Sequence, residues 1–304
     1  MIPSPAKDPE IATTASSSVL ICGCGDVGSR LARLLVAKGW QVAGLRRQVQ
    51  CLPAGVSAIA GDLRSTQMPP DWPRQSPDYL VFCPAAGAGN DEQQHLSLYV
   101  DGLQHCLNWL SQRQQRPKRL LFVSSTGVYG QNDGSWVTED SPTQPRGFSG
   151  RIMAQAEALA ANSGLANTLV RLAGIYGPGR AHLLNKARQG AWAVPKPACF
   201  TNRIHSEDAA GLLAFLLQAD AAGQSLAGCY LGVDDTPAPL HEVLAWLGQQ
   251  LGVTTRQNAP EQRRGANKRC SNEKARALGW QPHYPSYQQG YAALVAGLGQ
   301  QAGA

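Results

Sequence analysis

Apolar residues in the first half of the chain form short runs that alternate with longer segments of helical periodicity. The runs predict strands, because four or five consecutive apolar residues suit a strand that is buried on both faces of a sheet. The segments between them carry apolar residues at intervals of three or four, which predicts amphipathic helices. The predicted strands are 19–22, 41–45, 56–60, 79–83, 119–125 and 168–172, and the predicted helices are 27–37, 95–110 and 151–161.

This alternation predicts an α/β fold with a Rossmann-type, doubly wound parallel sheet and right-handed crossovers. The pattern changes after Leu172, where a segment rich in Gly, Pro and Arg begins. Helices at 208–217 and 240–251, a strand at 228–231 and a basic loop at 256–269 are expected there. We therefore predict a flexible N-terminal tail over 1–17, a dinucleotide-binding domain over 18–172 and a smaller substrate lobe over 173–304 that returns to the main sheet at about 204–232.

A glycine motif lies between the first predicted strand and the first predicted helix. Gly23 permits a tight turn, Gly25 allows the backbone to approach a pyrophosphate, and Gly28 allows the helix to pack closely on the strand. The N–H groups of the first helical turn, at Asp26 and Val27, then face the phosphates. Strand, loop and helix occur in the required order, so the motif predicts a site for a nicotinamide dinucleotide.

The second predicted strand ends in Arg46 and Arg47. A site that prefers NAD usually carries Asp or Glu here, which accepts hydrogen bonds from the ribose 2′-hydroxyl. Two guanidinium groups instead suit a 2′-phosphate. We therefore expect NADP(H) to be preferred, with NAD(H) possible. The alternative is that one or both arginines point into solvent.

Composition narrows the class of protein further. The chain has 304 residues, of which 43% are hydrophobic and 16% charged, so it can bury a large core. No segment predicts a membrane span or a secretory signal, and the eight cysteines are scattered, so we expect a cytoplasmic protein without a metal site. The net charge of +6 rests on dispersed arginines, which favours binding of small-molecule phosphates over nucleic acid.

Several motifs together resemble the extended and atypical short-chain dehydrogenase/reductases, a group similar to the NAD-dependent epimerases/dehydratases. The resemblance extends over about 18–295 and implies a role for each matching segment. Asp62 and Leu63 would lie near the adenine, and Pro84, Ala85 and Ala86 near the cofactor ribose. The segments that carry the resemblance are 23–28, 61–63, 83–86, 121–130, 171–180 and 204–208.

The same resemblance assigns the active-site serine to Ser125, whose hydroxyl would donate a hydrogen bond to the substrate oxygen. The adjacent residue, Thr126, would also lie on the substrate side. In this family a tyrosine–lysine pair on the following helix moves the proton. Here Ser149 stands in the tyrosine position and Met153 in the lysine position, although Gly150 and Glu157 match. Neither residue can replace a phenol or an ammonium group. The family also implies that a homodimer could form through helices 95–110 and 150–162.

Three hypotheses follow from the missing pair. Another group could move the proton, with Tyr129, Tyr176 and His205 as weak candidates, since packing roles explain them as well. Alternatively, the chain binds NADP(H) without turnover, as a redox sensor or regulatory protein. In the third hypothesis, Ser125 and a water assist a hydride transfer that needs no strong side-chain acid, as in the reduction of an activated double bond.

The substrate side of the predicted site differs from that of the nucleotide-sugar relatives. Gly174 occupies the place where those relatives commonly carry asparagine, which argues against a nucleotide sugar. Arg180 and Arg203 could bind an anionic small molecule, and Lys268 and Arg269 could contribute, unless all four belong to a solvated basic face. We predict an NADP(H)-binding oxidoreductase or an epimerase/dehydratase-like protein.

Overall fold

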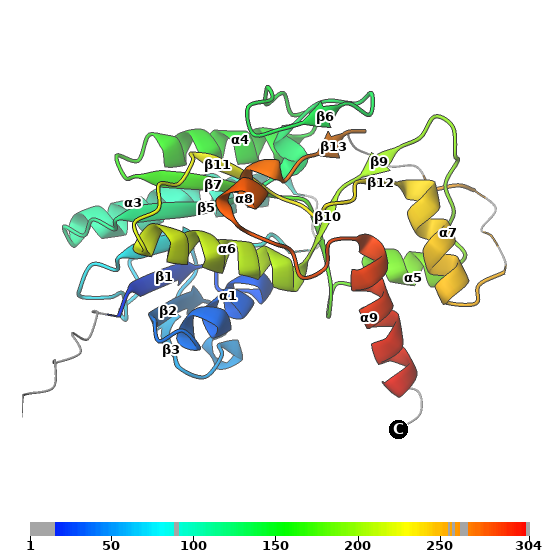
Figure 1. Ribbon diagram of the computed structural model, residues 1–304. Helices are drawn as coiled ribbons and strands as arrows, with labels where there is room; N and C mark the ends of the chain where they lie inside the picture. Colours follow the sequence, from blue (N-terminus) through cyan, green and yellow to red (C-terminus); the bar gives the residue numbers. More distant parts are fainter. Residues whose placement is uncertain (1–15, 88–90, 255, 257–258, 262–266, 302–304) are drawn as a thin grey trace, which may run out of the picture.

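The main element of the fold is a parallel sheet of seven strands. The computed structural model describes residues 16–87, 91–254, 256, 259–261 and 267–301. The strand order is β3-β2-β1-β4-β5-β7-β11, which confirms the predicted doubly wound Rossmann-type fold (Figure 1). The strands are β1 (Ser18–Cys22), β2 (Gln41–Arg46), β3 (Val56–Ala60), β4 (Tyr79–Phe82), β5 (Arg119–Ser125), β7 (Asn167–Leu172) and β11 (Cys229–Gly232).

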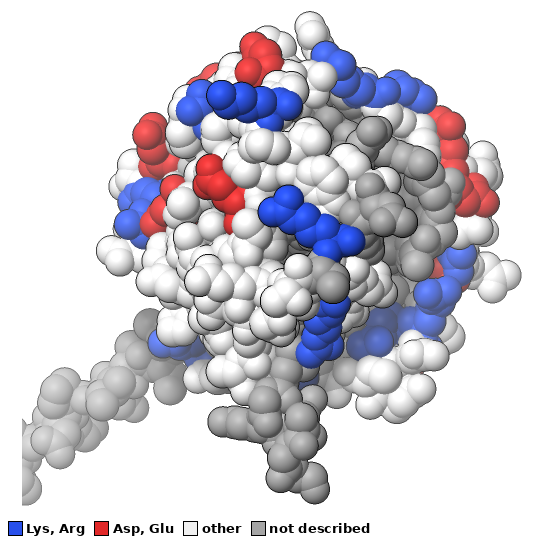
Figure 2. Space-filling model, turned by 90° about the vertical axis from the view of Figure 1, so that its right-hand side faces the viewer, with Lys and Arg blue, Asp and Glu red and all other residues white. Residues whose placement is uncertain are grey.

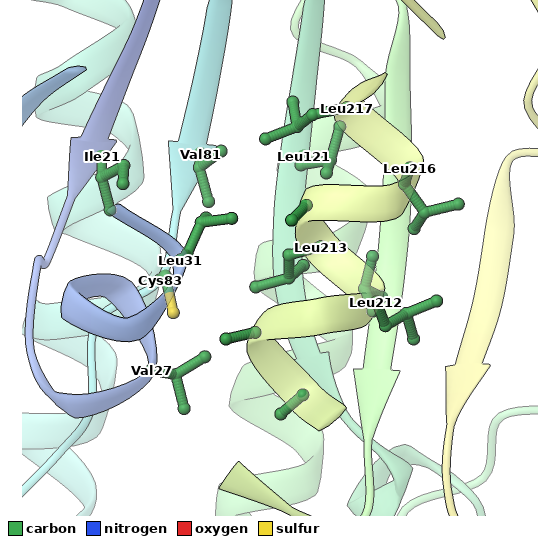
Figure 3. Packing of buried hydrophobic residues seen from close by; sticks show 14 of the residues in the cluster. Ile21, Val27, Leu31, Val81, Cys83, Leu121, Leu212, Leu213, Leu216 and Leu217 are labelled. Atoms are coloured by element: carbon green, nitrogen blue, oxygen red, sulfur yellow. The ribbon is translucent and has the colours of Figure 1, made fainter. Parts of the chain in front are cut away.

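Helices cover both faces of the sheet, because successive residues of each strand point to opposite sides. In β1, Ile21 packs against α1 (Asp26–Val36) and α6 (Ser206–Ala221), whereas Leu20 faces the side of α3 (Gly102–Gln112) and α4 (Phe148–Ala161). Figure 3 shows part of the first core, where leucines of α1 and α6 lie over the strands. The apolar runs in the sequence reflect this burial on both faces.

The predicted helix at 95–110 is interrupted. It begins as α2 (Glu92–Leu96), where the Asp91 side chain accepts a hydrogen bond from the backbone N–H of Gln94. It then passes through a π-helical turn, η2 (Ser97–Asp101), before it continues as α3. An extra residue in the turn changes which side chains face the sheet, and such turns often occur at functional sites. The hydrophobic pattern gave no indication of this turn.

The C-terminal part of the chain forms a smaller lobe with a third apolar core, at the right of Figure 1. Its helices are α5 (His182–Arg188), α7 (Leu240–Gln250) and α9 (Tyr287–Gln301). On the face of the lobe in Figure 2, Lys and Arg are scattered among uncharged residues. The remaining elements are β6 (Trp136–Val137), β8 (Gly174–Tyr176), β9 (Phe200–Thr201), β10 (Arg203–His205), β12 (Ala238–Pro239), β13 (Arg269–Cys270), α8 (Glu273–Leu278), η1 (Val49–Cys51) and η3 (Thr126–Val128).

Some predicted segments lie wholly or partly outside the described residues. Of the predicted tail at 1–17, only Ser16 and Ser17 are described, and 257–258 and 262–266 of the predicted basic loop are also outside. Within the part of the chain that is described, every helix is too short or too polar to cross a bilayer.

Candidate functional site

A cavity of about 550 Å³ lies at the carboxyl ends of the central strands. The neighbours β1 and β4 mark the point where the strand order reverses, which is where doubly wound sheets bind their ligands. The loops that follow β1, β2, β3 and β4 all contribute to the wall. Predicted cofactor residues that line the cavity are Gly23, Gly25, Arg46, Arg47, Asp62, Leu63, Pro84, Ala85 and Ala86.

The glycine loop has the geometry that a pyrophosphate requires. Gly23 adopts a φ of +84°, and its N–H donates to the Leu45 carbonyl at 3.1 Å. A Cβ at Gly23 would lie 2.5 Å from the Pro84 Cα, so no side chain fits there. At Gly25 the nearest atom to a Cβ would be 3.9 Å away, which leaves an open cradle that a side chain would fill. Helix α1 starts directly after it and presents its free N–H groups.

Asp26, in the first turn of α1, would repel a bound pyrophosphate if its charge were not balanced. Its carboxylate accepts hydrogen bonds from Arg30 Nε at 2.9 Å and from Arg180 Nε at 2.6 Å. Burial alone would raise the pKa of the Asp26 carboxyl, but the two arginines outweigh it and lower that pKa. Arg180, predicted to bind substrate, therefore joins the C-terminal lobe to the glycine loop.

The end of β2 supplies the positive charge of the cavity. Arg46 donates from Nη1 to the Cys51 carbonyl at 3.3 Å, and Arg47 is exposed. Within the described residues, neither arginine has a carboxylate partner within 4.0 Å. Across the cavity, Arg64 binds Asp62 and thereby lowers the pKa of its carboxyl. Arg46 and Arg47 thus remain available to an anion.

Ser125 ends β5 close to the start of α4. Its Oγ accepts a hydrogen bond from the Gly127 N–H at 3.0 Å, which leaves the hydroxyl hydrogen free to donate. The helix packs closely here, because a Cβ at Gly150 would lie 2.4 Å from the Gly127 carbonyl oxygen. The neighbouring Thr126 is buried. The structure therefore places Ser125 on a closely packed turn beside α4, and Ser125 is not among the residues that line the cofactor cavity.

The two residues that the resemblance puts in the tyrosine and lysine positions, Ser149 and Met153, both lie on α4. Ser149 is exposed near the start of the helix. The Met153 side chain is only 6% exposed and belongs to the apolar core that α3 and α4 form with the sheet. Nothing at these two positions can donate or accept a proton at neutral pH.

The three alternative proton donors named from the sequence are buried in structural contacts. The Tyr129 hydroxyl pairs with Arg171 Nη1 at 2.6 Å, and burial raises the pKa of the Tyr129 phenol. The Tyr176 ring stacks on Tyr291, and burial also raises the pKa of Tyr176. His205 accepts the Glu207 N–H at the start of α6, and burial lowers the pKa of its imidazole. None of the three lines the cofactor cavity.

A second cavity, of about 670 Å³, opens in the C-terminal lobe. Arg180, Lys186 and Arg203 line it together with Tyr176. Arg203 is 4% exposed, and its Nη1 has no hydrogen-bond partner among the described residues.

The other two predicted basic residues of the substrate side lie elsewhere. Lys268 donates from Nζ to the Tyr129 carbonyl, and the Arg269 guanidinium lies over the rings of Trp136 and Phe200. Both residues make contacts with other segments of the protein, and neither lines this second cavity.

Asp234 gives this lobe a pH-dependent stability. Burial raises the pKa of its carboxyl to about 7, although the Arg203 charge and the Thr236 N–H act in the opposite direction. The folded state therefore favours the protonated form, so stability present below the ordinary carboxyl pKa is lost as the pH rises through about 7. We expect the free energy of unfolding to fall by roughly 2 kcal/mol between pH 5 and 7. Asp234→Asn should remove this slope in urea unfolding, whereas Asp140→Asn, which removes an exposed carboxylate, should keep it. Equal slopes for both variants would contradict the prediction.

The parallel sheet and the glycine-loop cavity at its carboxyl edge define a protein of the Rossmann-type α/β class. The family model described as the NAD dependent epimerase/dehydratase family matches residues 19–226. The chain belongs to this family, and the predicted family resemblance is confirmed.

Relatives of known sequence or structure agree with this assignment. Protein YeeZ of Escherichia coli K12 is 32% identical over 216 residues, which cover 67% of this chain and 74% of YeeZ. A Methylobacillus flagellatus structure assigned to the NAD-dependent epimerases/dehydratases is 37% identical and has a TM-score of 0.77. The match covers 93% of this chain and 99% of the Methylobacillus flagellatus chain. The NAD complex of Thermus thermophilus UDP-glucose 4-epimerase has a TM-score of 0.74 at 23% identity, covers 91% of this chain and 97% of its own, and supports the fold alone.

The cavity also contains residues that the sequence did not single out. Gln94, His95 and Leu98 line it from α2 and η2. His95 was visible only as the first residue of a predicted helix, and no motif marks it. Its place in the wall depends on the packing of α2 against α4, which sequence periodicity does not report.

Proposed function

We propose that this protein is an NADP(H)-dependent oxidoreductase that works without the tyrosine–lysine proton relay of its family. The observation that carries the proposal is the pair Arg46 and Arg47, which line the cavity at the end of β2 without a carboxylate partner among the described residues. When bound, the nicotinamide would supply or accept a hydride. The glycine loop would hold the pyrophosphate, and the two arginines the 2′-phosphate.

Reduction is favoured over epimerisation by one relative. The 3-diazoavenalumate denitrifying reductase of a Streptomyces species is 30% identical over 178 residues, which cover 50% of this chain and 54% of that protein. Arg203, buried with a free Nη1 beside the lobe cavity, supports an anionic small molecule as the substrate. Its unpaired donor would be satisfied by a carboxylate or phosphate oxygen.

The test of the proposal is a pair of dissociation constants, followed by a turnover screen. Fluorescence titration should give an NADPH Kd at least tenfold below the NADH Kd, and equal or tighter NADH binding would overturn the NADP(H) preference. NADPH oxidation should then be followed with ketones, aldehydes and enones as acceptors. Tight binding without turnover of any acceptor would favour the second candidate, a non-catalytic redox sensor, which the buried Met153 supports.

Replacing both cavity arginines by glutamine should reverse the cofactor preference. Each charge-assisted hydrogen bond contributes about 1.5–3 kcal/mol, so Arg46→Gln with Arg47→Gln should raise the NADPH Kd by at least about 100-fold. NADH lacks the 2′-phosphate, and its Kd should change less than about threefold for the same reason. The matched control is Arg33→Gln, which removes an exposed arginine of α1 and should leave both constants unchanged. An unchanged NADPH Kd in the double variant would show that the arginines do not bind the phosphate.

A further inference from the structure

Among the described residues that line the cofactor cavity, His95 carries the one imidazole. His95 is half-buried on α2, and its ring lines the cavity. Its Nδ1 faces the Asp91 backbone carbonyl at 2.9 Å. A nitrogen that faces a carbonyl carries the proton, so Nε2 holds the lone pair of the neutral ring. Within the described residues, Nε2 has no hydrogen-bond partner.

His95 lies beside the start of α4. Its ring meets the Phe148 ring edge-on, with centroids 5.3 Å apart, and Phe148 immediately precedes Ser149. The adjacent Tyr99 ring lies 5.9 Å away, and its hydroxyl accepts the Ala86 N–H at 3.1 Å. The imidazole is thus fixed between the segment after β4 and the start of α4.

The strand order separates this end of the cavity from the phosphate-binding end. Arg46 ends β2 and Asp62 follows β3, toward one edge of the sheet. Ala86 follows β4 and Ser125 ends β5, on the other side of the glycine loop. Helix α4 packs on the turn that begins at Ser125, and α2 packs on α4. His95 therefore lines the cavity next to α4, and its ring contacts Phe148, which precedes the position where the family resemblance puts the proton donor.

We infer that His95 is a catalytic residue, the acid and base that takes the place of the missing tyrosine. This inference rests on the proposed oxidoreductase function. In the reductive direction, the carbonyl carbon of the substrate gains a hydride from the reduced nicotinamide, which is left oxidised. The carbonyl oxygen gains the proton that the protonated His95 ring loses from Nε2, and the product is an alcohol. The neutral ring then regains a proton from solvent.

The location of His95 can be tested by NMR without any turnover. His95→Gln identifies the His95 imidazole resonance among those of the six histidines, and its chemical shift is then compared between the NADP+ and NADPH complexes. The oxidised nicotinamide carries one more positive charge than the reduced ring, so the His95 chemical shift should differ between the two complexes. His105 is the matched control, because its Nδ1 also faces a backbone carbonyl, that of Leu63, but it lies outside the cavity wall. Equal His95 chemical shifts in the two complexes would overturn the inference.

The catalytic role is tested by turnover of an accepted ketone or aldehyde. His95→Gln should lower kcat at least 100-fold, keep the NADPH Kd within twofold and change the shape of the pH profile of kcat. His105→Gln should leave kcat unchanged. If His95→Gln keeps the turnover rate of the wild type, the inference about His95 is overturned and the oxidoreductase function is not. Binding without wild-type turnover overturns the oxidoreductase function and this inference with it.

Discussion

Glu157→Gln is expected to lower the free energy of unfolding by about 3–5 kcal/mol, since it leaves a buried guanidinium without its counter-charge. The Glu157 carboxylate accepts Arg171 Nε at 2.9 Å and Nη2 at 2.8 Å, and Ser124 Oγ at 2.5 Å. Both partners of this ion pair are less than a tenth exposed. A glutamine keeps the shape but turns an amide donor toward Arg171. Urea unfolding measures the loss.

Two further variants distinguish the free-energy cost of an unpaired buried charge from the loss of the ion-pair attraction itself. The double replacement Glu157→Leu with Arg171→Met should regain most of the stability, because it leaves no buried charge behind. Arg151→Gln breaks an exposed pair with Glu92 at 3.8 Å and should change stability by less than about 0.5 kcal/mol. Glu157→Gln within about 1 kcal/mol of wild type would contradict the prediction.

Gly23→Ala is expected to cost about 2–5 kcal/mol of stability and to weaken NADPH binding at least tenfold. The backbone cost comes from the φ of +84°, and the larger part from a methyl group only 2.5 Å from the Pro84 Cα. To relieve this contact, the glycine loop must move away from the segment after β4. The N–H groups at the start of α1 then no longer converge on one phosphate position. Urea unfolding and NADPH fluorescence titration measure the two effects.

Gly39 provides the matched control for this prediction. Its φ is +78°, but a Cβ there would meet no atom within 4 Å. Gly39→Ala should therefore cost only about 1 kcal/mol and leave the NADPH Kd unchanged. Equal losses in the two alanine variants would mean that backbone conformation alone, and not the contact with Pro84, restricts residue 23.

The parallel sheet could be predicted from the sequence because its strands are apolar on both faces and its helices are periodic. The short strands of the C-terminal half could not. β8 and β10 have three residues each and β9 and β12 only two, too few for any pattern, and their pairing joins distant segments. Residues 23–28 were recognised as a cofactor site because their function depends on local backbone. The contact between Asp26 and Arg180, and the position of His95, depend on helices packed side by side.

The edge strand β11 of the central sheet lies in the C-terminal part of the sequence, after the first segments of the smaller lobe. β11 pairs with β7, and α6 leads to it along the face that also carries α1. A fragment cut after Leu172 would leave β7 as an open edge and strip Leu212, Leu213, Leu216 and Leu217 from the core beside α1. The dinucleotide-binding half is thus not a free-standing unit that could be exchanged between proteins. Any recombination that swaps the lobe must carry α6 and β11 with the Rossmann half.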